Sequence, residues 1–387
     1  MNYKKRWSKK RRIKQLHHRN NSRYKEVRQR LLNLNLLKNL SAFNTQKYDS
    51  KEYFAALEYA SLHQISIKQT CLMERFQGRT CPSPEQVMKC CRKTSPELIT
   101  NFINFALKTQ FNALPKKIQQ QLKKSGTLII DFHQDCYYGE KDNPYIRKSK
   151  TKKSTNLFYE YLTADLYCTN GCFTIALFHR TPGKTIISLM TQLLNYVEKV
   201  ISLKIVIFDG EFAAIDVLTL LLRKGVKFLG RKSRTIRVKE HFHTYYDSPD
   251  WEKKRKWRLI EMHTRKPKDK TVIVEICPQN IHGNMKALIK SPGWSITPNY
   301  ADKLYRKRFN IETGYRDKHK FQLFTCTKIL STRLLAFLIA VLLWNCWQSF
   351  LIWIRSLKSY SQDLPREFLF QITANWIKFY LKKMLYT

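Results

Sequence analysis

Three acidic residues of this chain could together perform metal-dependent chemistry on phosphate. They are Asp131, Asp209 and Glu312, separated by 78 and 103 residues. Hard carboxylate oxygens suit Mg²⁺, which proteins bind through one or two carboxylates plus substrate phosphates. Each acid alone has an ordinary structural explanation, such as capping a turn. Together, in a strongly basic chain, they predict a divalent-metal site for phosphate chemistry.

The third acid lies in the basic stretch Tyr305–Lys320. As a single helix at about 100° per residue, this stretch has one face about 80° wide that carries Tyr305, Arg308, Glu312, Arg316 and His319. Two guanidiniums beside a carboxylate keep it ionised, as a metal ligand must be. A salt-bridged surface helix would have the same spacing. Asp317 is turned about 140° from Glu312, so we expect it to point to solvent or to Lys320.

Two short apolar runs must position the other two acids. Thr127–Ile130 and Ile205–Phe208 have the composition of buried strands, and they end directly on Asp131 and Asp209. Open α/β folds place their sites at the carboxyl edge of the sheet. Asp135, four residues after Asp131, is the alternative first ligand.

The elements around these runs alternate between strand and helix patterns. The expected elements are a hairpin of Leu157–Tyr167 and Phe173–Phe178, helices over Thr185–Lys199 and Phe212–Arg223, and a strand over Val226–Leu229. This order predicts a mixed α/β layer architecture.

Two further regions have a different texture. Residues 51–114 are helical in pattern, with good helix starts at Ser83-Pro84 and Ser95-Pro96, and form either a DNA-binding region or a packing module. Residues 231–270 hold fourteen Lys/Arg against six acids, with interspersed aromatics. Strands at Trp257–Glu261 and Thr271–Ile276 predict an inserted β subdomain, either a nucleic-acid surface or a solvated excursion.

The charge of the chain points to a polyanionic partner. Its 387 residues include 71 Lys+Arg and 29 Asp+Glu, a formal net charge of +42. Charge of one sign at this density destabilises a compact state unless a polyanion screens it, and nucleic acid gains affinity through counterion release. Residues 1–30 alone carry thirteen Lys/Arg and one acid, which predicts a phosphate-binding arm. A ribosomal or membrane-surface protein is the alternative.

Hydrophobic and cysteine patterns bound the environment. Leu334–Trp344 is wholly apolar, but Asn345, Gln348 and Ser349 interrupt its continuation, so we expect a buried helix behind the site rather than a membrane span. The ten cysteines form no disulfide pattern, and a reducing cytosol fits them best. A zinc site is the alternative, with the ligands Cys71, Cys81, Cys90, Cys91 and His63.

The same motifs resemble the DDE transposases of prokaryotic insertion sequences, in the IS-four-like group. The resemblance rests on Leu128-Ile129-Ile130-Asp131 with Tyr137-Tyr138-Gly139, Val206-Ile207-Phe208-Asp209-Gly210-Glu211-Phe212, and Tyr305-x2-Arg308-x3-Glu312. That group continues Glu-x6-Lys, whereas His319 stands here. Glu312-x3-Arg316 is instead similar to the ISH-three-like branch, which leaves the last basic role open among Arg316, Lys318 and Lys320.

The resemblance implies a fold and an activity. The expected fold is α/β, an RNase H-like catalytic core whose mixed sheet is flanked by helices, with an inserted β subdomain and a helical N-terminal region. The expected divisions are a basic arm at 1–40, a DNA-binding region at 41–120, a catalytic domain at 125–355 with the insertion at about 231–298, and a basic aromatic tail at 356–387. The activity is strand cleavage and strand transfer at insertion-sequence ends.

The resemblance also implies site roles and partners. Asp131, Asp209 and Glu312 would be catalytic and would hold two Mg²⁺ ions, with Mn²⁺ as a substitute. The expected DNA- and phosphate-binding residues are Tyr305, which would pack on DNA near the cut, and Arg308, Arg316, Lys318 and Lys320. The expected partners are double-stranded DNA (terminal inverted repeats and target) and a second copy of the chain on DNA, with no membrane. The expected location is the cytoplasm, at the nucleoid. A structure-specific nuclease on the same fold and a non-enzymatic nucleic-acid-binding protein are the rival functions.

Overall fold

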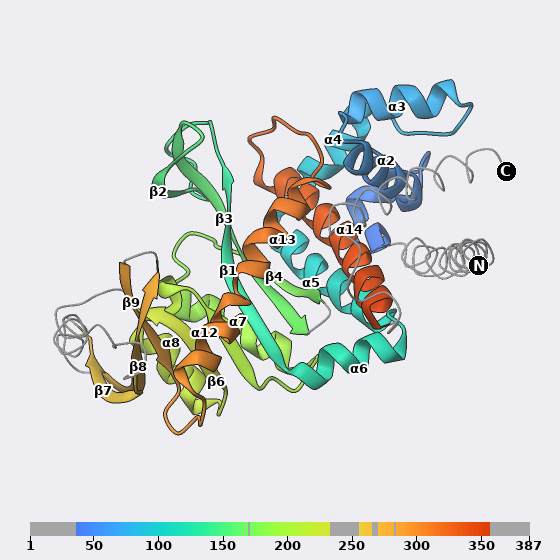
Figure 1. Cartoon of the computed structure of the whole chain (residues 1–387). Helices are drawn as coiled ribbons and strands as arrows, with labels where there is room; N and C mark the ends of the chain where they lie inside the picture. The colour runs from blue at the N-terminus through green and yellow to red at the C-terminus, as the bar shows by residue number, and fades with distance from the viewer. Residues whose placement is uncertain (1–35, 169–170, 233–254, 265–269, 282–283, 357–387) are drawn as a thin grey trace, which may run out of the picture. The chain divides into compact units, whose positions relative to one another are not determined.

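The chain divides into two compact units. The computed structural model describes residues 36–168, 171–232, 255–264, 270–281 and 284–356 (Figure 1). Met1–Gln119 and Lys318–Thr387 form the first unit, and Gln120–Asp317 form the second. Most of the predicted basic arm, the predicted tail and part of the basic block after β6 lie outside the described residues, so those predictions remain predictions.

The first unit is helical where it is described. Its elements are η1 (Leu36–Asn39), η2 (Ser41–Phe43), α2 (Ser50–His63), α3 (Ile67–Phe76), α4 (Pro84–Lys93), α5 (Pro96–Asn112) and α14 (Leu330–Ser356). The predicted starts of α4 and α5 are confirmed, because Ser83 and Ser95 each accept a hydrogen bond from the third helical amide and a proline follows each of them. α6 (Lys116–Ser125) crosses from the first unit to the second.

α14 is the long apolar helix, and its place differs from the prediction. It packs against α2, α4 and α5 within the first unit, and does not belong to the same unit as the three acids. Leu330–Ser349 is long and apolar enough to cross a membrane, but 94% of that window is buried inside the protein. Buried amides account for part of its interruption: Asn345 donates to Gln110 Oε1 at 2.9 Å, and Gln110 donates to the Leu342 carbonyl at 2.8 Å. This pattern is typical of a core helix.

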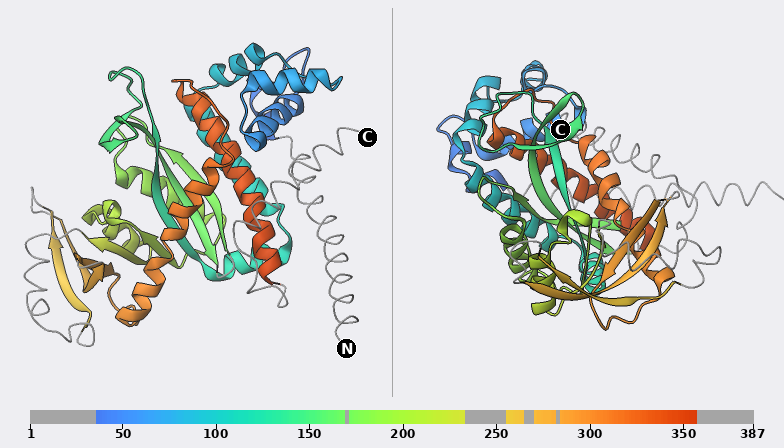
Figure 2. Two further views of the ribbon diagram at one scale, coloured as in Figure 1. Left: turned by 45° about the horizontal axis from the view of Figure 1, so that its top comes forward. Right: turned by 90° about the vertical axis from the view of Figure 1, so that its left-hand side faces the viewer.

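The second unit is a mixed α/β structure built on one sheet of nine strands among the described residues. The strands are β1 (Thr127–Cys136), β2 (Arg147–Lys152), β3 (Thr155–Cys168), β4 (Gly171–His179), β5 (Ile205–Phe208), β6 (Lys227–Lys232), β7 (Arg258–His263), β8 (Thr271–Ile281) and β9 (Asn284–Lys290). The helices are α7 (Ile186–Glu198), η3 (Gly210–Phe212), α8 (Ile215–Arg223), α12 (Pro298–Arg306) and α13 (Phe309–His319). α7 and α8 pack on each other, and they contact β4 and β6 respectively (Figure 2).

The centre of the sheet is parallel, and its middle strand, β5, is apolar throughout. β5 lies between β1 and β6 and runs parallel to both, while β3 runs antiparallel to β1 and β4 antiparallel to β3. The predicted hairpin and the predicted buried strand Ile205–Phe208 are therefore confirmed. The strand predicted over Thr127–Ile130 is also present, but β1 continues through Asp131 to Cys136 instead of ending at Asp131. Gly230 of β6 lies opposite Phe208, and a Cβ at Gly230 would lie 2.2 Å from the Phe208 ring. Only glycine leaves room for that ring directly before Asp209.

The inserted strands do not form a separate sheet. β9 pairs with β6, β8 with β9, and β7 with β8, so they extend the central sheet in the order β2-β3-β1-β5-β6-β9-β8-β7. The predicted strands of the insertion are present, and they continue the central sheet. The edge of β6 was open to a new strand, and unpaired backbone groups at such an edge favour pairing.

Candidate functional site

Asp131 and Asp209 lie level with each other on neighbouring parallel strands. Ile129 of β1 pairs with Ile207 of β5, and two residues further along each chain stand Asp131 and Asp209. Adjacent strands lie about 4.8 Å apart, so the two carboxylates start close together, Asp131 from the middle of β1 and Asp209 from just beyond the end of β5. Glu312 approaches from the first turn of α13. The structure thus gathers the three predicted acids from β1, the end of β5 and α13 (Figure 1).

The Arg308 guanidinium lies among these carboxylates. Its two terminal nitrogens lie 3.7 Å from Asp131 Oδ2 and 2.7 Å from Glu312 Oε1. Arg308 is 3% exposed. Burial opposes its charge, but Tyr305 and the carboxylates of Asp209, Glu312 and Asp131 outweigh burial and raise the Arg308 pKa, so it remains a cation. One buried cation therefore faces three acids.

Tyr305 is held between two arginines and contacts the second acid. The guanidinium carbons of Arg231 and Arg308 lie 4.6 and 5.6 Å from the centre of its ring. Its hydroxyl donates to Asp209 Oδ1 at 3.3 Å. Tyr305 is fully buried, so in this arrangement its ring cannot pack on DNA as the resemblance implied. It orients Asp209 instead.

The stretch predicted as one helix is two helices. α12 ends at Arg306 and α13 begins at Phe309. Between them the amides of Arg308 and Ile311 donate to carbonyls three residues back, at 2.9 Å each. Such bonds wind the chain at about three residues per turn, so a count of 100° per residue fails across them. Tyr305 and Arg308 are therefore turned inward.

The environment of Asp131 disfavours its charge. Burial is the largest cause, and the neighbouring Asp209 and Glu312 add to it, while Arg308 opposes it; the pKa of Asp131 is raised to about 7. The backbone amide of Phe132 donates a hydrogen bond to Asp131 Oδ1 at 2.9 Å. The site therefore holds more negative charge than Arg308 neutralises.

The remaining predicted residues lie at different places. Arg316 is exposed on α13, one turn after Glu312. Lys318 is fully buried, with its Nζ 4.3 Å from the centre of the Trp344 ring, and therefore is not on a phosphate-accessible surface in this arrangement. Lys320 is exposed, and its carbonyl accepts from Gln64 Nε2 at 2.7 Å. Both lysines belong to the first unit.

The two rival acids are both buried. Asp317 is 7% exposed and has interaction partners, so the expectation that it points to solvent was wrong. Asp317 lies on the same helix as Glu312 and is still turned about 140° from it, but the face of α13 that carries Asp317 is buried. Asp135 is 9% exposed on β1, four residues beyond Asp131 and thus about 13 Å along the strand. Asp131, and not Asp135, is the acid level with Asp209.

The three carboxylates are chemically suited to bind Mg²⁺, but in this structure their oxygens are not arranged around one ion. Three carboxylates with a surplus of negative charge are the ligands that hard cations prefer. In the described ranges, however, no three His, Cys, Asp or Glu side chains are grouped closely enough to hold an ion. The oxygens of Asp131 and Glu312 face the Arg308 guanidinium rather than one common point.

Several residues of the site had no clear signal in the sequence. Tyr315 donates to the Asp131 carbonyl at 3.1 Å and lies 2.6 Å from the Thr163 hydroxyl, which joins α13 to the sheet. Arg231 could have been found, because it lies on the third parallel strand, β6, one residue beyond the Gly230 that pairs with Phe208, and is therefore level with Asp209. Arg180, which contacts Glu160 and Glu211, comes after β4 and has no motif around it.

Comparisons with known proteins yield one informative likeness. No family model matches the chain, and no curated protein matches it. Among solved structures, piggyBac transposase in a synaptic complex with hairpin DNA matches with a TM-score of 0.52 and 13% identity, over 87% of this chain and 73% of that one. The fold is transposase-like. At this identity the likeness concerns the fold, so the chemistry of this chain must be argued from its own residues.

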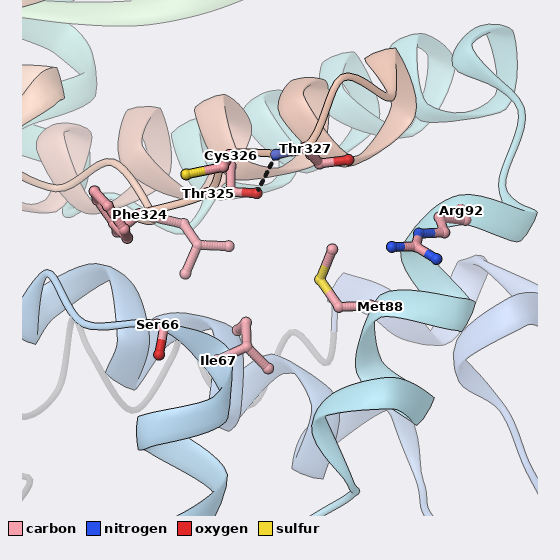
Figure 3. A pocket seen from close by; sticks show the side chains of 9 residues that line it. Ser66, Ile67, Met88, Arg92, Phe324, Thr325, Cys326 and Thr327 are labelled. Atoms are coloured by element: carbon pink, nitrogen blue, oxygen red, sulfur yellow. Dashed lines mark hydrogen bonds between the residues drawn. The ribbon is translucent and has the colours of Figure 1, made fainter.

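A cavity in the first unit offers no comparable chemistry. It has a volume of about 340 Å³ and lies among the start of α3, α4 and the segment before α14 (Figure 3). The nine lining residues are Ser66, Ile67, Met88, Arg92, Leu323, Phe324, Thr325, Cys326 and Thr327. None of the nine is a carboxylate or an imidazole, so this cavity is not a candidate for acid–base or metal chemistry.

Proposed function

We propose that the protein is a DNA transposase of the DDE type that cleaves and joins strands at insertion-sequence ends. The observation that carries the proposal is the convergence of Asp131, Asp209 and Glu312, in that chain order, around Arg308 beside the centre of the sheet. The transposase-like fold and the net charge of +42 support it.

The strand order supports an RNase H-like core in particular. β4-β3-β1-β5-β6 places two antiparallel strands on one side of β1 and two parallel strands on the other. In this core the first acid lies on β1 and the second follows β5. The IS-four-like and ISH-three-like assignment rests on the motifs alone.

Asp131, Asp209 and Glu312 would hold Mg²⁺, or Mn²⁺ in its place, once Arg308 has moved from between them. Bound Mg²⁺ supplies Lewis-acid activation of a water or a DNA 3′-hydroxyl and stabilises the leaving oxygen. Tyr305 would orient Asp209 through its hydroxyl. Arg308 would leave the carboxylates to neutralise a DNA phosphate, which guanidinium matches geometrically.

Exposed cations of α13 and of the segment after it would bind the DNA backbone. Arg316 is exposed one turn from Glu312, and Lys320 is exposed after α13. Lys318 contacts Trp344 in its buried position and would contribute to stability rather than to phosphate binding. We further propose that a second copy joins on DNA, at the nucleoid.

A strand-transfer assay tests the function. The substrate is DNA carrying the terminal inverted repeats that flank the gene, with a target duplex, with and without Mg²⁺. Cleavage followed by joining supports a transposase, and cleavage without joining supports a structure-specific nuclease. Asp209→Asn should abolish both steps and leave DNA retention intact. If Asp209→Asn still cleaves and joins DNA, Asp209 does not take part in the reaction.

One observation favours a non-enzymatic alternative. Arg308 forms ion pairs with two of the three acids, as a purely structural cluster would. A nucleic-acid-binding protein with such a cluster would bind DNA and show no Mg²⁺-dependent cleavage. The same assay therefore separates this alternative from the two enzymes.

A further inference from the structure

β2 and the first residues of β3 form a two-stranded ribbon beyond the end of β1. Arg147 pairs with Phe158, and Lys152 pairs with Thr155. β1 ends at Cys136, opposite Phe158, so Thr155–Leu157 of β3 extend past it beside β2, and Tyr137, the residue after β1, still bonds to them. Figures 1 and 2 show the ribbon extending beyond the other strands of the second unit.

The ribbon carries charge of one sign. Five of the seven residues 147–153 are basic and none is acidic. Four of them are exposed lysines: Lys148, Lys150, Lys152 and Lys153. The preceding loop adds two acids and one lysine, so residues 140–153 hold six bases against two acids, a net +4. Like charges on so narrow an element repel one another unless an anion lies against them.

The tip of the ribbon retains lysine where the backbone disfavours it. Lys153 and Ser154 have φ of 47° and 65° and connect a paired Lys152 and Thr155. Two positive φ angles are typical of a type I′ turn, for which Asn-Gly is the favoured sequence. A lysine in the left-handed region costs free energy, and such costs cluster at functional positions. The Tyr138 hydroxyl donates to the Lys153 carbonyl at 2.8 Å and fixes the tip.

The ribbon lies at a definite distance from the three acids. Asp131 pairs with Thr163, and the tip begins at Thr155, eight residues away on the same strand. At about 3.3 Å per residue this is roughly 25 Å. A DNA duplex rises about 3.4 Å per base pair, so the same distance spans roughly seven to eight base pairs.

We propose that this ribbon binds the phosphate backbone of duplex DNA, about seven to eight base pairs from the phosphate that reacts at the three acids. The distance rests on the proposed function, whereas the contact with DNA rests on the ribbon's own charge and shape. A two-stranded ribbon fits the major groove. Its lysines are point charges that contact phosphates, so they supply affinity and register rather than base specificity.

The first test compares two sets of three charges. One variant combines Lys148→Gln, Lys150→Gln and Lys153→Gln. Its control removes the exposed charges of Lys123, Lys124 and Lys199, of which the first two precede β1 at its other end. The slope of log K against log salt changes by about 0.9 for each lost phosphate contact. For the ribbon variant we expect a slope shallower by roughly 2 to 3, and for the control no change; equal slopes would overturn the proposal.

A second variant separates charge from folding. Lys153→Asn combined with Ser154→Gly supplies the favoured type I′ sequence, so the turn is kept while one charge is lost. We expect an unchanged or higher melting temperature and a salt slope shallower by about 1, and Lys153→Arg should keep the slope of the natural protein. Natural affinity in the Asn-Gly variant would show that the tip does not contact DNA.

Duplex length tests the distance and separates the two proposals. Terminal-repeat duplexes trimmed to about four base pairs on either side of the cleavage position should bind the natural protein no more tightly than the triple variant. Extension to about twelve base pairs on one side should restore the difference. If the protein cleaves DNA but neither the triple variant nor the duplex length changes DNA affinity, the proposed ribbon contact is overturned and the proposed function is kept. A ribbon effect without cleavage under any condition overturns the proposed function and keeps the DNA contact.

Discussion

Two arginines lie between carboxylates on opposite faces of β1, and the clusters differ in balance. On one face Arg180 lies 2.9 Å from Glu160 and 3.4 Å from Glu211. On the other, Arg308 lies 2.7 Å from Glu312 and 3.7 Å from Asp131. Gln134, which donates to Glu160 at 2.8 Å, is three residues after Asp131, and side chains three apart on a strand point to opposite faces.

The Arg180 cluster has a buried central pair and a balanced charge. Its central pair has side-chain exposures of 12% for Arg180 and 5% for Glu160. Arg147 adds a second cation, 4.0 Å from Glu160. Two acids therefore meet two bases. A balanced buried pair of this kind positions strands and has no demand for another ion.

The Arg308 cluster is short of positive charge. Its outer acid, Glu312, is 47% exposed, much as Glu211 is 49% exposed in the other cluster, but here three acids share one cation. The pKa of Asp131 is raised to about 7, which burial and the two other acids cause. The comparison teaches that an arginine between carboxylates is not evidence of a purely structural role. The surplus of negative charge is what marks a site for an added cation.

The largest expected effect comes from removing each arginine. Arg180→Ala leaves Glu160 buried without its closest cation, which should cost about 3–5 kcal/mol of unfolding free energy, with no rescue by divalent ions. Arg308→Ala should also destabilise in EDTA, but Mg²⁺ or Ca²⁺ should restore stability by mass action. Urea unfolding of both variants with and without the ion measures this. Equal ion responses would erase the difference between the clusters.

The second expected effect is a change in stability of opposite sign when one acid of each cluster is neutralised. Because folding raises the pKa of Asp131 to about 7, the folded state binds more protons than the unfolded state between about pH 4 and 7. Stability from this group therefore falls as pH rises through that window and is lowest above it. In EDTA at pH 8, Asp131→Asn should be more stable than the natural protein by on the order of 1–3 kcal/mol.

Glu160→Gln provides the matched control for that prediction. It removes one partner of the balanced pair, so it should destabilise the protein at pH 8. The pH dependence of unfolding should flatten between pH 4 and 7 in Asp131→Asn. A stabilised Glu160→Gln, or an Asp131→Asn variant that keeps the full pH slope, would contradict the contrast.

The smallest effect concerns the hydroxyl that orients Asp209. Tyr305→Phe keeps the ring between Arg231 and Arg308 and removes one hydrogen bond, at a cost of about 1 kcal/mol of stability. We expect DNA cleavage to fall more than DNA affinity. Tyr315→Phe is the control, because the Tyr315 hydroxyl donates to the Asp131 backbone carbonyl and not to a carboxylate. A Tyr305→Phe variant with reduced affinity and normal cleavage at saturating DNA would assign Tyr305 to DNA binding.

The sequence predicted the strands well because their burial has a simple pattern. Ile205–Phe208 is apolar throughout, as a strand covered on both faces must be, and it ends on Asp209. The two helix starts after Ser83 and Ser95 were equally local, since a capping side chain and a proline set them.

The contacts around the acids could not be predicted in the same way. The break between α12 and α13 depends on bonds at Arg308 and Ile311, and no proline or glycine marks it. Arg231 meets Tyr305 across 74 residues, and Arg180 meets Glu211 across 31. Such pairs are set by tertiary packing, which periodicity does not encode. The packing of α14 on α2, α4 and α5 of the first unit could not be predicted for the same reason.

The most direct test of the account is strand transfer by Glu312→Gln in Mg²⁺ on terminal-repeat DNA. The change removes one negative charge and one of the two oxygens that could bind a metal ion. Because the Glu312 side chain is half-exposed, the fold should persist, and urea unfolding checks this. The account predicts that cleavage and joining are lost while DNA binding is equal to or tighter than that of the natural protein. Robust Mg²⁺-dependent cleavage and joining by Glu312→Gln would contradict it.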